Sequence, residues 1–273
     1  VANGADLSLS GTSVGNQFAG RTLSIAAGGT VNIAGNLELD PGTNAISNAG
    51  TLNLNSGDIR HVFSSQGSMT ITNTGVINKN NANTFILGSS PVAEAVNLTN
   101  SGTLNVNAGT LRLDGGTSSS TGSVNLLGGT TWHTNGVTMN FGAASTWNSA
   151  GTITSSAGSA TFAMPTANFT QTGAITTSGS GSVSFTPNVS VPSINLSGGS
   201  TSFNGSATTT SLAQSGGTLA GSGTLTLTGT GNSWSGTTGS WAGGGTVVVA
   251  NGADLSLSGT SVGNQFAGRT LSI

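Results

Sequence analysis

Hydrophobic and polar residues alternate one by one in many short segments of this chain. Thr-Val-Asn-Ile at 30–33, Thr-Leu-Asn-Leu at 51–54 and Thr-Leu-Asn-Val at 103–106 share one pattern, and Ser-Val-Asn-Leu at 123–126 repeats it. A period of two places successive side chains on opposite faces of a β-strand. We therefore expect short strands that turn Val, Ile and Leu toward a core. No segment keeps the i, i+3, i+4 spacing of an amphipathic helix.

An Asn stands third in each of these segments, on the face opposite the hydrophobic residues. If the strands stack in register, their Asn side chains meet on the outer surface and can hydrogen-bond along the stack. The pattern predicts a surface Asn ladder made of Asn32, Asn53, Asn105 and Asn125.

A Gly or other small residue followed by the start of a strand recurs at irregular steps of 18 to 29 residues. The Gly positions are Gly29, Gly50, Gly75, Gly102, Gly122, Gly151, Gly173, Gly199, Gly217 and Gly245. Helical repeats keep a fixed period, whereas the coils of a β-solenoid tolerate insertions in their loops. The spacing predicts an all-β fold, a parallel β-helix with about ten or eleven coils.

A much longer repeat frames the chain, because residues 1–25 recur without a change at 249–273. Such identity at every core and loop position indicates a tandem array. We expect residues 1–248 to be one full period and 249–273 to be the start of the next. Open strand edges at both ends of such a piece also predict end-to-end association.

Composition narrows the function classes. Charged residues make up 4% of the chain, its formal net charge is −2, and it has 45 Gly and no Cys. The chain thus lacks the basic field that gathers nucleic acid, and it has no apolar run long enough to cross a bilayer. It also lacks the thiols of disulfides and of thiolate zinc sites. We expect no nucleic-acid partner, no membrane insertion and no cofactor.

The few ionisable residues give little basis for catalysis. Polysaccharide-acting β-helix enzymes need carboxylates that meet in a groove, and Glu38, Asp40 and Asp58 are the closest candidates. We interpret the charged residues instead as solvated or ion-paired surface groups and expect no enzyme. His61 and His133 lie far apart in the sequence, so no metal site is expected.

Tryptophan is present without tyrosine, which leaves an alternative open. Trp132, Trp234 and Trp241 could form an exposed ledge that stacks on glycans or on a neighbouring fibre, or they could fill the core. Exposure of the indoles distinguishes the two. Thr-rich segments such as 207–211 and 224–228 raise a further alternative, an ice-binding solenoid, but a Thr-x-Thr in every coil is missing.

The Asn/Thr/Ser/Gly-rich strands, with phrases such as GTLNL and GTLRLDGG, resemble the repetitive passengers of filamentous haemagglutinin-like and autotransporter-type bacterial surface proteins. The resemblance implies a right-handed parallel β-helix, secreted and displayed at the bacterial cell surface. The expected function is that of a structural repeat unit in a giant secreted protein. Stacked coils would form an extracellular fibre, sheath or adhesive filament whose partners are adjacent repeats, neighbouring fibres and surface glycans. The alternative is a glycan- or receptor-binding adhesin module.

Overall fold

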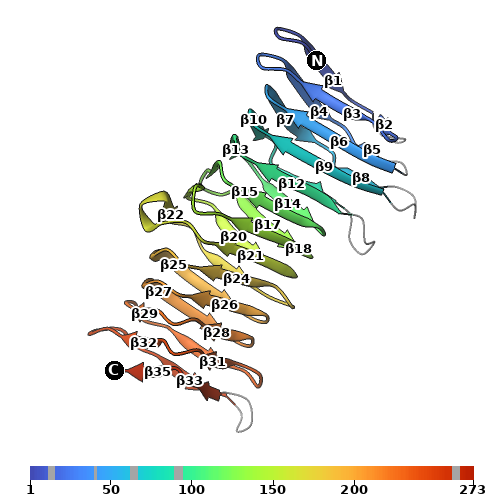
Figure 1. The fold of residues 1–273 in the computed structure, drawn as a ribbon. Helices are drawn as coiled ribbons and strands as arrows, with labels where there is room; N and C mark the ends of the chain where they lie inside the picture. The colour runs from blue at the N-terminus through green and yellow to red at the C-terminus, as the bar shows by residue number, and fades with distance from the viewer. Residues whose placement is uncertain (12–15, 40–41, 62–66, 89–94, 260–264) are drawn as a thin grey trace.

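The computed structural model is a three-sided solenoid in which the chain winds through about eleven turns (Figure 1). The structure describes residues 1–11, 16–39, 42–61, 67–88, 95–259 and 265–273. In this part of the chain, every pairing between two named strands is parallel, and the only helical element is a 3-10 turn, η1 (Thr166–Asn168). The predicted all-β parallel β-helix is therefore confirmed.

The first side of the solenoid is an eight-stranded sheet. Its strands, in stacking order, are β1 (Asp6–Leu9), β4 (Thr30–Ala34), β7 (Thr51–Ser56), β10 (Val76–Lys79), β13 (Thr103–Val106), β16 (Ser123–Leu126), β19 (Thr146–Ser149) and β22 (Phe169–Gln171).

The second side belongs to a fifteen-stranded sheet. Its strands are β2 (Asn16–Phe18), β5 (Leu37–Leu39), β8 (Ile59–His61), β11 (Thr84–Leu87), β14 (Thr110–Asp114), β17 (Thr131–Asn135), β20 (Thr152–Ser155), β23 (Ile175–Thr177), β25 (Val189–Leu196), β27 (Ala207–Gln214), β29 (Thr224–Leu227), β30 (Ser233–Ser235), β32 (Thr246–Val249), β33 (Ser256–Ser258) and β35 (Thr270–Ser272).

The third side is a twelve-stranded sheet. Its strands are β3 (Thr22–Ile25), β6 (Gly42–Asn48), β9 (Gly67–Asn73), β12 (Val96–Asn100), β15 (Thr117–Ser120), β18 (Val137–Phe141), β21 (Gly158–Phe162), β24 (Ser182–Phe185), β26 (Ser200–Phe203), β28 (Thr218–Ala220), β31 (Ser240–Ala242) and β34 (Gln265–Ala267).

The first two sides merge at the long strands β25 and β27. The second half of β25 pairs with β23, while its first half lies against β22. In the same way, the first half of β27 pairs with β29 and its second half with β30. We name face A the first sheet continued through the first halves of β25 and β27 to β29, β32 and β35. Face B runs from β2 through the second halves of β25 and β27 to β30 and β33, and face C is the third sheet.

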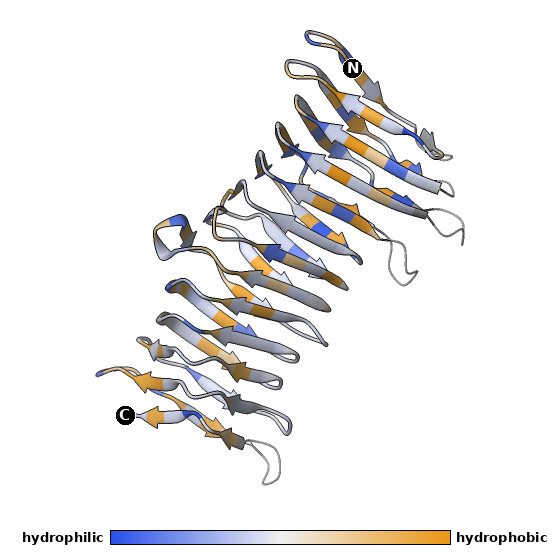
Figure 2. Ribbon diagram, viewed as in Figure 1, coloured by the Kyte–Doolittle hydropathy of each residue, from blue (hydrophilic) through white to orange (hydrophobic). Residues whose placement is uncertain are grey.

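The strands bury every second side chain inside the solenoid, so they need no separate layer of helices or strands packed against them. Most strands show the same burial sequence, in which every second side chain is enclosed and its neighbour is partly exposed. Figure 2 shows the resulting alternation of hydrophobic and polar positions along the strands. Each turn is covered by the turns above and below it, so two or three inward side chains per strand suffice for a continuous core.

The Gly residues that precede the predicted coils stand at different corners of the solenoid. Those from Gly29 to Gly122 precede face A, Gly151 and Gly173 precede face B, Gly199 and Gly217 precede face C, and Gly245 precedes face A again. The expectation of one coil per step is therefore wrong at three steps. The steps from Gly122 to Gly151, from Gly173 to Gly199 and from Gly217 to Gly245 each cover one turn and a third.

Candidate functional surfaces

The outer surface of face A carries a continuous ladder of Asn side chains. In each step an amide Nδ2 donates to the Oδ1 of the turn before: Asn53 to Asn32 at 2.8 Å, Asn78 to Asn53 at 3.0 Å, Asn105 to Asn78 at 2.9 Å and Asn125 to Asn105 at 2.9 Å. The four residues predicted from the sequence belong to this outer Asn ladder. The prediction missed Asn78, although it too stands third in the strand that follows Gly75.

A second ladder lies inside the solenoid, at the corner between face C and face A. The Nδ2 of Asn48 donates to Asn73 at 2.7 Å, that of Asn73 donates to Asn100 at 2.7 Å, and that of Asn100 donates to Ser120 Oγ at 3.1 Å. Each amide also donates to a backbone carbonyl at the start of a face A strand. Buried amides are costly unless they are hydrogen-bonded. This inner Asn ladder provides acceptors for all three Nδ2 groups, whereas the Oδ1 of Asn48, at its first step, has no partner among the described residues.

Sequence reasoning missed the inner Asn ladder, although a signal was present. Asn48, Asn73 and Asn100 each stand two residues before a Gly that opens a face A strand. The alternation pattern predicts which strand residues face inward. It does not show that the last residue of a strand bonds across the corner to the next face.

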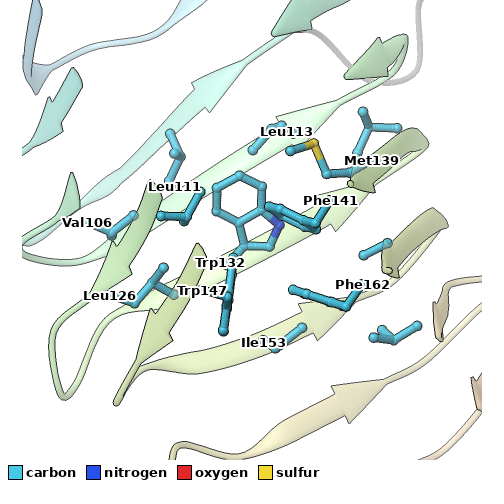
Figure 3. Close-up of a cluster of buried hydrophobic side chains, with 14 of the residues drawn as sticks. Val106, Leu111, Leu113, Leu126, Trp132, Met139, Phe141, Trp147, Ile153 and Phe162 are labelled. Atoms are coloured by element: carbon cyan, nitrogen blue, oxygen red, sulfur yellow. The ribbon is translucent and has the colours of Figure 1, made fainter. Parts of the chain in front are cut away.

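All four tryptophans lie in the core. Trp132, Trp147, Trp234 and Trp241 are at most 1% exposed. Figure 3 shows the Trp132 ring among aliphatic and aromatic side chains, and its centroid lies 5.6 Å from that of Phe141 in an edge-to-face contact. A glycan-stacking ledge requires exposed indoles, and these positions offer none.

Two of the indoles are anchored by buried glutamines. The Nε1 of Trp147 donates to Gln171 at 2.9 Å, and the Nε1 of Trp241 donates to Gln214 at 2.7 Å. A buried indole N–H usually has such an acceptor, although those of Trp132 and Trp234 have none among the described residues. These tryptophans therefore act as large core residues whose polar atom is satisfied from a neighbouring turn.

A network of polar side chains, with the carboxylate of Asp114 buried at its centre, lies on face B. Arg112 donates from Nε and Nη2 to the two carboxylate oxygens of Asp114 at 2.7 and 2.8 Å. Asn135 Nδ2 donates to the same carboxylate at 3.0 Å, and Ser156 Oγ lies 3.2 Å from Asn135 Oδ1 and 2.8 Å from His133 Nε2. Five side chains from three strands or their ends thus form one network.

The surroundings of the His133 ring favour its neutral form. Burial lowers its pKa, the positive charge of Arg112 lowers it further, and Asp114 opposes both. Contact between a Ser hydroxyl and a neutral imidazole is the beginning of a nucleophile and base pair. Among the described residues, however, no acceptor orients the other ring nitrogen of His133. The contact joins two strands and lacks the third group that would aim the base.

Two further carboxylates act as structural acceptors. Asp58 accepts the backbone N–H of Ile86 at 2.8 Å, and Asp254 accepts those of Gly231 and Asn232. Glu38 lies beside Arg60 in the ladder between β5 and β8. Asp40 lies outside the described residues. Within the described part of the chain, no group of three His, Cys, Asp or Glu residues could hold a metal ion.

Two basic residues overturn the expectation that the charged groups are solvated or ion-paired at the surface. Lys79 is fully buried on the inner side of face A, between Leu54 and Val106 in the ladder. Its Nζ donates to the backbone carbonyl and the side-chain oxygen of Asn81 and, at 2.8 Å, to the carbonyl of Ala108. Arg269 is also buried, with its guanidinium on backbone carbonyls. Corner carbonyls replace water around both cations.

The buried Lys79 makes the free energy of unfolding depend on pH in the alkaline range. Burial lowers its pKa from 10.5 to about 8. Below pH 8 both the folded and the unfolded chain carry the proton, so the burial cost is present in full. Between pH 8 and 10.5 only the unfolded chain keeps it, so the free energy of unfolding rises with pH, by about 3 kcal/mol for a pKa difference of about 2.5.

Urea unfolding at pH 7.5, 9 and 10.5 measures this rise, and Lys79→Met is the matched variant. Lys79 is the only lysine, and the chain has no Tyr and no Cys, so Lys79→Met removes the one side chain whose type ordinarily titrates in this window. We expect the variant to show a flat profile. An equal rise in Lys79→Met would show that Lys79 is not the source.

Comparisons with protein-family models, with curated proteins and with solved structures return no match. Among the described residues, no helix has the length and hydrophobicity to cross a membrane.

Proposed function

We propose that this chain is a structural repeat unit of a giant secreted bacterial protein, in which stacked coils build an extracellular fibre, sheath or adhesive filament. One observation carries the proposal. The repeated 25-residue segment pairs through one edge at its first occurrence and through the opposite edge at its second. A single copy between two periods could therefore pair on both edges at once.

The core residues agree at this junction. Leu9 in β1 stands beside Ile33 of β4, and its counterpart Leu257 in β33 stands beside Trp234 of β30. Ile33 and Trp234 are both buried. In a tandem chain the same Leu would lie between the two, so the hydrophobic core would run from one period into the next.

The third strand of the segment repeats this agreement. Leu23 in β3 stands beside Ile46 of β6, and its counterpart Leu271 in β35 stands beside Val247 of β32. Ile46 and Val247 are buried, whereas Leu257 and Phe266 are half exposed at the last turn of the structure. Another turn stacked there would cover these side chains. Burial of apolar surface and pairing of open strand edges both favour continuation.

The junction also has a polar latch. Arg269 Nη1 donates to the carbonyl of Gly221 at 3.1 Å, and its Nη2 donates to that of Gly223 at 3.0 Å. Arg21, the same residue of the first copy, is exposed. In a tandem chain the Arg at position 21 of each later period would donate in the same way to the corner carbonyls of the preceding period.

Export and surface display are supported by composition and by the resemblance to filamentous haemagglutinin-like and autotransporter-type passengers. Charged residues make up only 4% of the chain, so its outer walls are mostly Ser, Thr and Asn. The chain has no Cys and therefore no thiol that needs a reducing compartment. Few charges repel a neighbouring fibre, so lateral bundling through hydrogen bonds should depend little on salt.

Arg269→Gln and Arg21→Gln form a matched pair for the latch. A hydrogen bond to a charged group contributes about 1.5 to 3 kcal/mol, so Arg269→Gln should loosen the last turns. Hydrogen exchange of residues 246–258 measures this loosening. Arg21→Gln should leave exchange unchanged, and equal effects of the two variants would contradict the latch.

Chains of one, two and three tandem periods test the proposed function by small-angle X-ray scattering. Strands stack about 4.8 Å apart, so about eleven turns add about 5 nm to a rigid rod with each period. We expect the maximum dimension to grow linearly by this amount. Separate bodies joined flexibly would instead give broad distance distributions, and the fibre proposal would then fail.

A further inference from the structure

The repeated segment lies on different faces of the solenoid at its two occurrences. In the first copy β1 lies on face A, β2 on face B and β3 on face C. In the second copy the corresponding strands are β33, β34 and β35. They pair with β30, β31 and β32, which places them on faces B, C and A. The identical sequence is shifted by one third of a turn.

The residue that opens the segment shows the same shift. The carbonyl of Val1 accepts the N–H of Ala26, which directly follows the face C strand β3. Val249, its counterpart, lies in the face A strand β32 beside Leu227. The displacement thus applies from the first residue of the segment to its last strand.

The three faces accept the same local sequence elsewhere in the chain. A Gly followed by Thr or Ser and an alternating strand opens β4 on face A, β20 on face B and β26 on face C. All three strands have the same alternation of partly exposed and buried residues. Because each of the three faces offers a strand nearly the same surroundings, the same segment can fold on any face.

We propose that each tandem period is rotated by one face relative to the period before it, with the next identical period as the partner at the junction. This inference rests on the proposed function as a tandem fibre. One period then holds about eleven and one third turns. Face A of one period continues face B of the preceding period, face B continues face C, and face C continues face A.

The rotation distributes surface chemistry around the fibre. The outer Asn ladder occupies face A of a period, and the Arg112–Asp114–His133 network occupies its face B. Each would appear on a given side of the fibre only once in three periods, a spacing of about 16 nm at about 4.8 Å per turn. A neighbouring fibre that docks on one side therefore meets all three faces in succession.

Pairs of nitroxide labels on engineered cysteines test the rotation, because the chain has no cysteine of its own. Ser233→Cys with Ser256→Cys reports a face B position, since these outward residues are neighbours in the ladder between β30 and β33. Thr226→Cys with Ser256→Cys is the matched control, since Thr226 faces outward from β29 on face A. Each pair is measured in the 273-residue chain and at the junction of a two-period chain.

We expect strong dipolar broadening for the first pair, at neighbouring strands about 5 Å apart, and none for the second. Broadening of the second pair instead of the first would overturn the rotation, because the segment would then repeat in phase. A rotated junction in a two-period chain that does not form a rod would preserve the inference and refute the fibre. A rod with an in-phase junction would support the fibre and refute the rotation.

Discussion

Replacing Gly102 with Ala is expected to destabilise the solenoid by about 3 kcal/mol or more, at the upper end of overpacking effects. A Cβ at this position would lie 2.1 Å from the carbonyl oxygen of Gly75 in the preceding turn and 2.8 Å from that of Thr74. Both obstacles are backbone atoms, so the clash is relieved only if two turns separate. Urea unfolding followed by circular dichroism measures the loss.

Gly128→Ala is the matched control for this substitution. The nearest atom to its added Cβ, in Ala150, is 4.0 Å away, and Gly128 does not have a positive φ. Lower entropy of the unfolded chain should make this variant equal to the parent or more stable by about 0.4 to 1 kcal/mol. Similar losses in the two variants would show that close stacking of the Gly corners does not limit the spacing of turns.

Replacing Asn73 with Ala is the second large perturbation, with an expected loss of about 2 to 4 kcal/mol. Asn73 is the middle of the inner Asn ladder and has no exposed surface. Its removal leaves the amide of Asn48 and the Oδ1 of Asn100 each without their partner in the ladder. Buried polar groups without partners are more costly than the bond itself is favourable.

The equivalent change in the outer Asn ladder separates burial from bonding. Asn78 also stands between two ladder neighbours, Asn53 and Asn105, but on the solvent side of face A. Water replaces its lost bonds, so Asn78→Ala should cost less than about 1 kcal/mol. Urea midpoints of the two variants compare them directly. An outer variant as damaging as the inner one would contradict the argument from burial.

The fold was predictable because the burial pattern repeats along the chain. Alternation in segments such as 30–33 and 103–106 fixes which side chains face inward, and the structure buries Val31, Ile33, Leu104 and Val106. The outer Asn ladder follows from the same period, because residues opposite the core must line up when strands stack in register.

Lys79 shows why part of the interior was not predictable. The alternation in Val-Ile-Asn-Lys at 76–79 places Lys79 on the same side as buried Ile77. The positive charge of Lys79 nevertheless predicted a position on the surface. The sequence does not reveal which corner carbonyls will surround its ammonium group. Its burial depends on Asn81 and Ala108, which only the folded turns bring to it.

The position of a strand on face A, B or C was also hidden. Gly-Thr steps look alike at each corner, so Gly122 and Gly151 read as successive turns although they precede different faces. Local sequence fixes a strand and its inward side, whereas the face depends on the total length of chain wound before it.

Electron cryomicroscopy of a chain with three tandem periods tests the central claim most directly. We predict one continuous rod with layers about 4.8 Å apart, with unbroken density from the strands at 233–249 through the repeated segment into those at 30–48 of the next period. A gap, a bend or loss of the layer spacing at each junction would contradict a continuous solenoid and would show that the periods fold as separate bodies.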